Sequence, residues 1–431
     1  MSVHEPLELN VQSGAAPAVL APNGRTTIPV ITTQPPAPKR STLTDDMKRG
    51  LDAPICLTWE LTYACNLACE HCLSSSGRRD PRELSTEECF AVIDELERLQ
   101  VFYVNLGGGE PMLRPDFFEI IEYAVSHHVG VKFSTNGTYI DAETATRLAS
   151  MDYLDIQISI DGATEDINDP LRGDGSFAKA IAAMEHLYAA QFGPFKISVV
   201  VTRNNVDQLD DFAAIAARYG AQLRVTRLRP SGRGADSWDE LHPTMDQQRQ
   251  LYHWLKDRPE VLTGDSFFHL SAFGEALPGL NLCGAGRVVC LIDPVGDVYA
   301  CPFVIHDEFL AGNVRDTGGF TAVWRNSELF TSLRQPSSPG ACGSCGSYDA
   351  CQGGCMASKF FVGLELDDPD PECVKGHAEE LLAARVPGTA PVPSVDHSRP
   401  GIERTFGRTG VSIGAKPQPV EARVSEPATF T

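Results

Sequence analysis

The stretch Leu57-Thr-Trp-Glu-Leu-Thr-Tyr-Ala-Cys-Asn-Leu-Ala-Cys-Glu-His-Cys72 indicates both the class of fold and the kind of chemistry. It begins in a short apolar run, residues 55–59, whose composition predicts a strand. Directly after this strand come Cys65, Cys69 and Cys72, spaced Cys-x3-Cys-x2-Cys. In folds built on parallel strands, the chemistry lies in the loops at the carboxyl ends of those strands. Three thiols at such a place predict a functional site.

Outward from this stretch, β-rich runs alternate with amphipathic helical patterns in six successive units. We expect strands at residues 55–59, 102–106, 131–134, 154–160, 195–201 and 223–228. We expect helices at residues 86–100, 115–127, 142–151, 177–190 and 207–219. This order predicts an α/β fold with a parallel sheet and right-handed crossovers, either rolled or doubly wound.

The alternation stops near Gly264, where the chain becomes rich in glycine and cysteine. This change predicts a second domain that is held together by metal rather than by a large apolar core. We therefore expect domains at residues 50–262 and 264–380. The terminal segments 1–45 and 387–431 each hold seven of the 30 prolines and are predicted to be largely disordered, with partner docking as the alternative.

The overall charge excludes several classes of partner. The 431 residues include 36 Lys and Arg against 57 Asp and Glu, a formal net charge of −21. An acidic surface without a basic patch repels phosphate backbones, so we expect no nucleic-acid partner. We find no apolar run of roughly 18 residues that would span a membrane. The acidic start of the chain lacks the apolar core of a signal peptide, so we expect a cytoplasmic protein without a membrane partner.

Cysteines are concentrated in two regions. Eleven of the 13 fall within residues 65–72 and 283–373, and such clustering is typical of metal ligands in a reducing compartment. The first three suit a cubic iron–sulfur cluster with one iron left open. A zinc site with His71 as fourth ligand is the alternative. Cys56, within a strand, and Cys89, on a helix, are most simply buried small apolar residues.

The first cysteine motif, in its place after strand one, resembles that of the radical S-adenosylmethionine (SAM) superfamily. The resemblance implies a partial (β/α)6 barrel like an incomplete TIM barrel. It also implies that Cys65, Cys69 and Cys72 hold a [4Fe–4S] cluster whose open iron chelates the amino and carboxylate groups of SAM. Transfer of one electron to the sulfonium would then release methionine and a 5′-deoxyadenosyl radical.

Other loops match the same superfamily in the expected order. The run Gly107-Gly-Gly-Glu-Pro111 by itself indicates only a tight turn. The resemblance implies that Gly108, Gly109 and Glu110 meet the methionine amino group of SAM. It further implies that Ser159 and Asp161 contact the ribose and that Arg172 pairs with the methionine carboxylate.

The C-terminal cysteines read Cys-x12-Gly-x4-Cys, then Cys-x2-Cys-x5-Cys-x3-Cys, then a last Cys. Two zinc ribbons are one interpretation of this pattern. The pattern also resembles the SPASM extension, which holds two auxiliary [4Fe–4S] clusters and would make three clusters in all. The resemblance implies a nearer cluster on Cys283, Cys290, Cys301 and Cys355, and an outer cluster on Cys342, Cys345, Cys351 and Cys373. The core pattern of the SPASM extension does not require Cys290.

Four further stretches, residues 57–65, 73–84, 228–236 and 264–271, resemble the mycofactocin radical maturases, and the likeness extends over residues 53–377. That family implies a small precursor peptide ending in Val-Tyr, a small peptide-binding chaperone protein and an electron donor. It also implies oxidative decarboxylation of the tyrosine, followed by a carbon–carbon link to the valine that closes a lactam. The alternatives are another SPASM maturase, of the sulfatase-activating, thioether-forming or quinone-cofactor type, and a zinc-stabilised binding protein without redox chemistry.

The sequence does not identify acid–base residues. Several arginines suit a peptide carboxylate but are individually better interpreted as solvated surface residues: Arg78, Arg79, Arg82, Arg229 and Arg233. His269 and Tyr63 are polar candidates near the strand ends, although a buried residue with satisfied hydrogen bonds is the simpler interpretation of each.

Overall fold

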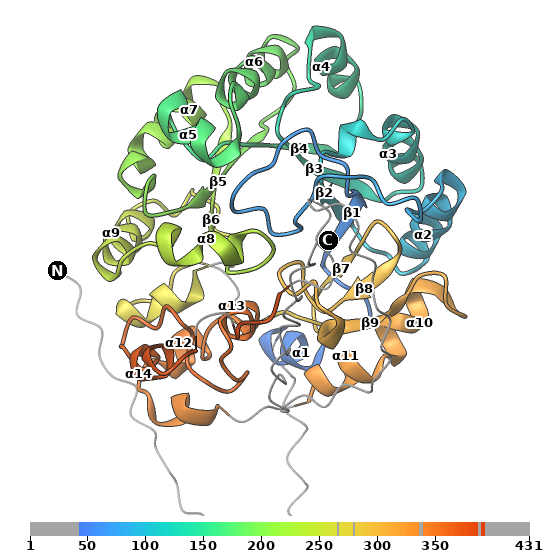
Figure 1. Cartoon of the computed structure of the whole chain (residues 1–431). Coiled ribbons are helices and arrows are strands. Elements are labelled where there is room, and N and C mark those ends of the chain that lie inside the picture. Colours follow the sequence, from blue (N-terminus) through green and yellow to red (C-terminus); the bar gives the residue numbers. More distant parts are fainter. Residues whose placement is uncertain (1–42, 265–266, 279–280, 336–338, 387–388, 393–431) are drawn as a thin grey trace, which may run out of the picture. The chain divides into compact units, whose positions relative to one another are not determined.

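The computed structural model describes residues 43–264, 267–278, 281–335, 339–386 and 389–392. Within these residues nine strands form one sheet in the order β6-β5-β4-β3-β2-β1-β7-β8-β9 (Figure 1). The strands are β1 (Cys56–Thr62), β2 (Tyr103–Gly108), β3 (Gly130–Thr135), β4 (Leu154–Ser159), β5 (Lys196–Val201), β6 (Gln222–Arg227), β7 (Val289–Ile292), β8 (Asp297–Tyr299) and β9 (Leu310–Asn313). The tails expected at 1–45 and 387–431 lie almost entirely outside the described residues.

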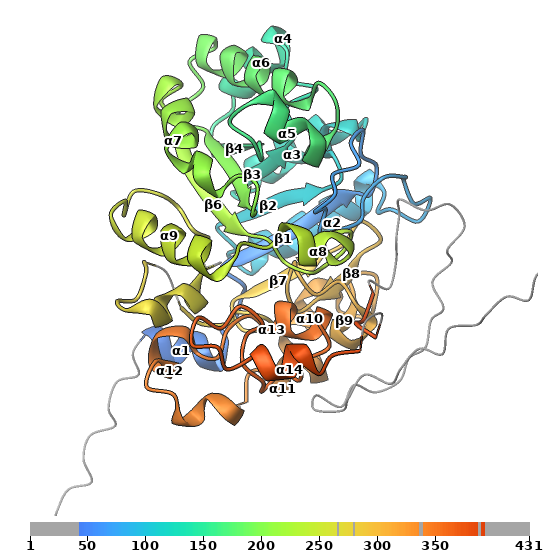
Figure 2. The same ribbon diagram turned by 60° about the vertical axis from the view of Figure 1, so that its left-hand side comes forward.

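Helices connect the parallel strands and lie on the outer side of the sheet (Figures 1 and 2). The helices up to the end of the β/α series are α1 (Leu43–Arg49), α2 (Thr86–Arg98), α3 (Phe117–Ser126), α4 (Ala142–Ala149), α5 (Glu165–Arg172), α6 (Ser176–Ala189), α7 (Leu209–Arg218), α8 (Gly234–Leu241) and α9 (Met245–Lys256). Those that follow are α10 (Gly319–Asn326), α11 (Glu328–Leu333), α12 (Tyr348–Cys351), α13 (Met356–Phe361) and α14 (Glu379–Ala383). Short 3-10 helices occur at Pro111–Leu113, Val206–Gln208, Phe268–Phe273, Asp307–Phe309 and Gly340–Ser344.

All six predicted strands are confirmed, and β1 to β6 pair in parallel with their sequence neighbours. The sheet remains open, so the six β/α units form a partial barrel. The helix predicted from residue 86 begins there because Ser85 and Glu88 form a capping box: each side chain accepts a hydrogen bond from the other residue's backbone N–H. Helix α5 was not predicted; it is short and contains Pro170.

Side chains alternate between the two faces of the parallel strands, as the strand period requires. On the face toward the helices, apolar residues such as Trp59, Phe133 and Ile156 join one large buried core. The residues at the intervening positions are mostly polar: Thr58, Glu60, Asn105, Lys132, Ser134, Asp155, Gln157, Ser159, Lys196, Ser198, Arg224 and Thr226. A polar inner face suits a site for a polar ligand better than a packed interior.

The sheet continues beyond the β/α series without a break. Strand β1 pairs in parallel with β7, so that Leu57 lies opposite Cys290. Strands β8 and β9 then extend the sheet by antiparallel pairing. The cysteine-rich C-terminal region is therefore joined to the partial barrel through β1, the edge strand of the β/α series. None of the helices in the described ranges is long and apolar enough to cross a membrane.

Replacement of Phe133 by alanine tests the core between sheet and helices. Phe133 is fully buried and packs edge-to-face on Phe117 with ring centroids 5.2 Å apart. We expect F133A to destabilise the protein by about 3–5 kcal/mol, because it leaves a cavity. The measurement is the apparent midpoint of thermal unfolding, with Phe102→Ala as the control, since Phe102 is 81% exposed. Equal midpoints for the two variants would contradict this account of the core.

Candidate active site

The loop that follows β1 carries Cys65, Cys69 and Cys72, and backbone hydrogen bonds give it a defined shape. Cys65 N donates to Gly77 O at 3.1 Å and Gly77 N donates to Tyr63 O at 2.8 Å, so the loop returns on itself. Figure 1 shows this loop lying across the ends of the parallel strands. The place of the three thiols at the carboxyl end of β1 is therefore the one that the sequence predicts.

Arg233 lies between β6 and α8 and holds the same loop in place by hydrogen bonds. Its Nε donates to Cys69 O and its Nη1 to Ser76 O, both at 2.8 Å. Arg233 is partly buried by these contacts, so the interpretation as a solvated surface residue is wrong for it. Arg78, Arg79 and Arg82 are exposed, as expected.

The three thiols lie close enough to influence one another. Burial raises the pKa of the Cys65 thiol to about 12, and the charges of Cys69, Glu110 and Cys72 raise it further. Burial also raises the pKa of Cys69, although the positive charge of Arg172 lowers it. None of these cysteines forms a disulfide. A buried group of free thiols is a soft donor set of the kind that iron–sulfur clusters and zinc select.

Across the described ranges, no three His, Cys, Asp or Glu side chains converge closely enough to hold a single metal ion. A cubic cluster is larger than an ion and its ligands bind at separate corners, so thiols that hold one stand further apart. The three thiols of the β1 loop fit a cluster in number, type and place.

The glycine run after β2 approaches the cysteine loop by its backbone. Gly109 N donates to Thr62 O and Glu110 N to Ala64 O, both at 2.8 Å. A Cβ atom on Gly109 would lie 2.0 Å from Ala64 O, and one on Gly108, whose φ is +104°, would lie 2.6 Å from Thr62 O. Only glycine permits this approach.

Glu110 is held in one orientation beneath the loop. Its carboxylate accepts hydrogen bonds from Thr135 Oγ1 at 2.9 Å and from Asn136 N at 2.9 Å, both at the end of β3. Burial raises the pKa of Glu110 to about 7, while these hydrogen bonds lower it. A carboxylate with its orientation fixed beside the thiols can receive a positively charged amino group.

Asp161 and Arg172 form the third part of the site, after β4. Arg172 Nε donates to Asp161 Oδ2 at 2.6 Å, and the same oxygen lies 2.9 Å from His71 Nε2. Val200 N donates to the other oxygen at 2.7 Å. Burial raises the pKa of Asp161, but Arg172 and His71 outweigh it and hold the pKa well below the usual range.

The structure thus brings together the residues that the sequence singled out in the partial barrel. The charges of Asp161, Cys69 and Cys65 raise the pKa of Arg172, and the charge of Glu110 raises the pKa of Cys65. Ser159 is the last residue of β4 and lies opposite Ser198 of β5. The sequence did not predict that His71 contacts Asp161 or that Arg233 holds the cysteine loop, because in each case the partner lies far away in the sequence.

The predicted nearer set of C-terminal cysteines surrounds Cys301. Burial raises the pKa of Cys301, and the charges of Cys283 and Cys355 raise it further. Cys290 is fully buried in β7, and burial, Cys56 and Cys301 raise its pKa. These cysteines come from three separate segments, and the fold brings them into one neighbourhood.

The predicted outer set is more local. Burial raises the pKa of Cys342, and the charges of Cys351, Cys373 and Cys345 raise it as well. Cys345 N donates to Cys342 O at 3.0 Å. All four members of this set are free thiols, so the set fits a second auxiliary cluster in number and type.

Of the two other polar candidates, Tyr63 is buried and donates its hydroxyl hydrogen to Asp293 Oδ2 at 2.6 Å, which confirms a satisfied buried residue. His269 is also buried, but its Nδ1 has no hydrogen-bond partner among the described residues, so the expectation of a satisfied residue is not met at this atom. Burial and the charge of Arg227 hold the pKa of His269 well below its usual value.

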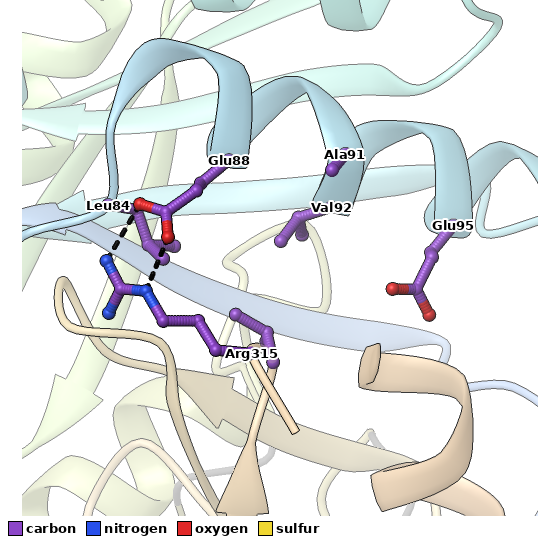
Figure 3. Close-up of a pocket in the computed structure, with 7 residues that line it drawn as sticks. Leu84, Glu88, Ala91, Val92, Glu95 and Arg315 are labelled. Carbon is purple, nitrogen blue, oxygen red and sulfur yellow. Dashed lines mark hydrogen bonds and ion pairs between the residues drawn. The ribbon is translucent and has the colours of Figure 1, made fainter. Parts of the chain in front are cut away.

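A groove of about 360 Å³ lies away from these residues, between α2 and the segment after β9 (Figure 3). Glu88 and Arg315 close one end, where Arg315 Nη2 donates to Glu88 Oε2 at 2.8 Å. At the other end Glu95 accepts hydrogen bonds from the N-terminus of α10, at 2.8 Å from Thr321 N. The carboxylates of Glu88 and Glu95 thus already accept hydrogen bonds from within the chain. None of the predicted site residues lines this groove.

Known proteins match most of the length of this chain. The radical SAM superfamily matches residues 59–216, and an iron–sulfur cluster-binding domain, SPASM, matches residues 283–346. The chain is 68% identical over 360 residues to mycofactocin maturase MftC of Mycobacterium tuberculosis, covering 83% of this chain and 92% of that protein. The chain belongs to the mycofactocin maturase family. The maturase of Mycolicibacterium smegmatis is 67% identical over 373 residues, which cover 86% of this chain and 94% of that one.

A solved structure supports the fold. The crystal structure of Streptococcus suis SuiB bound to S-adenosylmethionine matches with a TM-score of 0.62 at 18% identity, covering 76% of this chain and 78% of that one. The chain is accordingly a radical SAM and SPASM protein with an α/β partial barrel, as the sequence predicts, and the zinc-stabilised binding protein is not supported.

Gly109→Ala tests the close approach of the two loops in this maturase. The new Cβ would meet a backbone oxygen that cannot turn away, so we expect a loss of about 1–3 kcal/mol of stability. The matched control is Gly107→Ala, where a Cβ would meet nothing within 4 Å. The measurement is the thermal unfolding midpoint of both variants; a G109A midpoint as high as that of G107A would show that the loops are not locked together.

Glu60→Gln tests a buried acid on the inner face of β1. Burial raises the pKa of Glu60 to about 8, and Asp293 raises it further, while a hydrogen bond from Ser74 lowers it. Because the folded form keeps the proton that the unfolded form loses above about pH 4.5, stability should fall as the pH rises from about 5 to 8. E60Q should flatten this fall in unfolding midpoints measured across that range. An equally steep fall in E60Q would assign the pH dependence to other groups.

Proposed function

We propose that this protein is the radical SAM peptide maturase that oxidatively decarboxylates the C-terminal tyrosine of a mycofactocin precursor peptide and then links this residue to the preceding valine. The observation that carries the proposal is the 68% identity to a mycofactocin maturase over 92% of that protein's length. The arrangement of three thiols beside Glu110 and Arg172 supports the radical SAM part of it.

The residues that would hold the first cluster are Cys65, Cys69 and Cys72, leaving one iron for SAM. Together the reduced cluster and SAM supply a 5′-deoxyadenosyl radical. Glu110, with the backbone of Gly108 and Gly109, would receive the methionine amino group. Its position supports this role, because its carboxylate is fixed by Thr135 and Asn136.

Arg172 would bind the methionine carboxylate with the part of its fork that Asp161 does not use. Asp161 is fully buried and accepts hydrogen bonds from Arg172, His71 and Val200. We assign Asp161 chiefly to holding Arg172, and it meets the ribose only if it exchanges one of these partners. Ser159, which is partly exposed, is then the more direct ribose contact.

The two auxiliary clusters would be held by the nearer and outer cysteine sets. In this assignment residues 50–262 form the radical SAM unit and residues 264–380 the SPASM unit, which the shared sheet joins. Eight thiols in two groups support a count of two auxiliary clusters, with Cys290 as the fourth ligand of the nearer one. All of their irons would carry a protein ligand, so these clusters would be suited to electron transfer rather than to binding a substrate.

The first turnover is an oxidation of the peptide. The tyrosine loses a β-hydrogen atom and one further electron, and its carboxylate leaves as carbon dioxide, with the bonding pair forming the new double bond. The hydrogen atom would pass to the 5′-deoxyadenosyl radical, which becomes deoxyadenosine, and the electron would pass to an auxiliary cluster. A small peptide-binding chaperone would present the peptide, and an external electron donor would reduce the first cluster.

The second turnover leaves the oxidation state of the peptide unchanged. The valine would lose a β-hydrogen atom to a second deoxyadenosyl radical, its carbon radical would add to the double bond, and the cyclised radical would take up one proton and one electron that comes from the external donor. A lactam ring results.

The test is a turnover assay without oxygen, with reductant, SAM, a precursor peptide ending in Val-Tyr and the chaperone. We expect mass spectrometry to detect deoxyadenosine together with a peptide that has lost carbon dioxide. Cys65→Ala should abolish both products, because one iron ligand of the first cluster is lost. Cys89→Ala is the matched control: Cys89 is buried on α2 and belongs to no ligand set, so both products should persist.

Deoxyadenosine without any change in the peptide would keep the radical SAM activity and overturn the assigned substrate. Equal loss of products in C65A and C89A would overturn the assigned ligands of the first cluster.

A further inference from the structure

Arg229 is a buried arginine at the junction of the partial barrel and the SPASM unit. It lies two residues after β6 and is 6% exposed. Its Nε donates to Cys355 Sγ at 3.4 Å, and its Nη1 donates to Arg227 O at 3.3 Å. Its guanidinium also lies 3.7 Å from the ring centroid of Phe303. These contacts fix the plane of the guanidinium against the sulfur.

The charge of Arg229 has no carboxylate to balance it. In the part of the chain that the structure describes, no carboxylate oxygen lies within ion-pair distance of this side chain. The neighbouring Arg227, in contrast, pairs with both Asp370 and Glu372. A buried cation without a counter-charge is costly. The partner that can supply negative charge to Arg229 is the sulfur of Cys355.

The position of Cys355 itself is fixed by the paired arginine. Cys355 N donates to Asp370 Oδ2 at 2.7 Å, and Arg227 Nη1 donates to the same oxygen at 2.9 Å. Arg227 and Arg229 both come from the end of β6, so one strand of the partial barrel sets both the backbone and the sulfur of this cysteine.

We propose that Arg229 raises the reduction potential of the auxiliary cluster held through Cys355, and so makes that cluster the acceptor of the electron removed from the peptide. The inference rests on the ligand set of the proposed function. On reduction the cluster gains one electron, and a fixed positive charge with an N–H directed at its thiolate stabilises the added negative charge. Arg229 is thus a positioning residue for electron transfer, and it need not touch the peptide.

We expect loss of the hydrogen bond from Arg229 to Cys355 to change the ratio of oxidised to reduced cluster roughly tenfold at a given potential, which is about 59 mV for one electron.

The experiment is a redox titration of the cluster-loaded protein without oxygen, followed by electron paramagnetic resonance. In Arg229→Gln we expect one auxiliary signal to move to a lower potential while the iron content stays that of the wild type. Arg229→Lys keeps the charge but lacks the Nε–H donor and should move the same signal by less. Arg147→Gln removes a surface charge that pairs with Glu122 and should leave every potential unchanged.

Two outcomes separate the inference from the proposed function. A wild type that binds iron for only one cluster overturns the auxiliary ligand sets. Unchanged potentials in R229Q, with those ligand sets intact, overturn the role of Arg229 alone. If R229Q binds less iron, R229K decides: a lower potential supports the inference, and a potential equal to or above that of the wild type overturns it.

Discussion

Two backbone hydrogen bonds hold the active-site end of this protein together: Gly109 N to Thr62 O and Glu110 N to Ala64 O. They lock the loop after β2 onto the loop after β1, at a distance that only glycine allows. The loop that carries the thiols and the Glu110 carboxylate are therefore held in a constant position relative to each other. In the proposed function, the distance between the first cluster and the Glu110 carboxylate that would orient SAM depends on this contact.

The same sheet serves two chemical purposes on its two faces. The helix-facing side chains are apolar and form one continuous core. The inner face carries polar side chains, among them Glu60 with its raised pKa, which a packed interior would not tolerate without cost. The helix-facing core supplies the stability that allows the inner face to remain polar and available to ligands.

The pairing of β1 with β7 makes the auxiliary-cluster region part of the same rigid sheet. In the proposed function, electron transfer between a peptide on the inner face and a cluster in the C-terminal region would depend on a fixed separation, and a continuous sheet would provide it. Arg227 and Arg229 reinforce the junction from β6: one is neutralised by Asp370 and Glu372, the other is directed at Cys355. Two arginines of one strand end therefore differ in role because of their partners.

The sequence alone determined the six parallel strands and the place of Cys65, Cys69 and Cys72 in the loop after the first of them. Strand period, turn glycines and the spacing of these three cysteines are local properties, and each is encoded within a few residues. Helix α5 was missed because Pro170 disrupts its local pattern. The sequence also placed Arg229 and Arg233 among candidate surface residues, since nothing near them in the chain indicates burial.

Only the tertiary structure decided which charged groups meet. His71 and Asp161 are 90 positions apart, and Arg227 and Asp370 are 143 positions apart. Spacing carries no information at such separations, because the pairing follows from the order and register of the strands. The burial of Arg229 and its hydrogen bond to Cys355 have the same cause, because the fold places the end of β6 against the segment that carries Cys355.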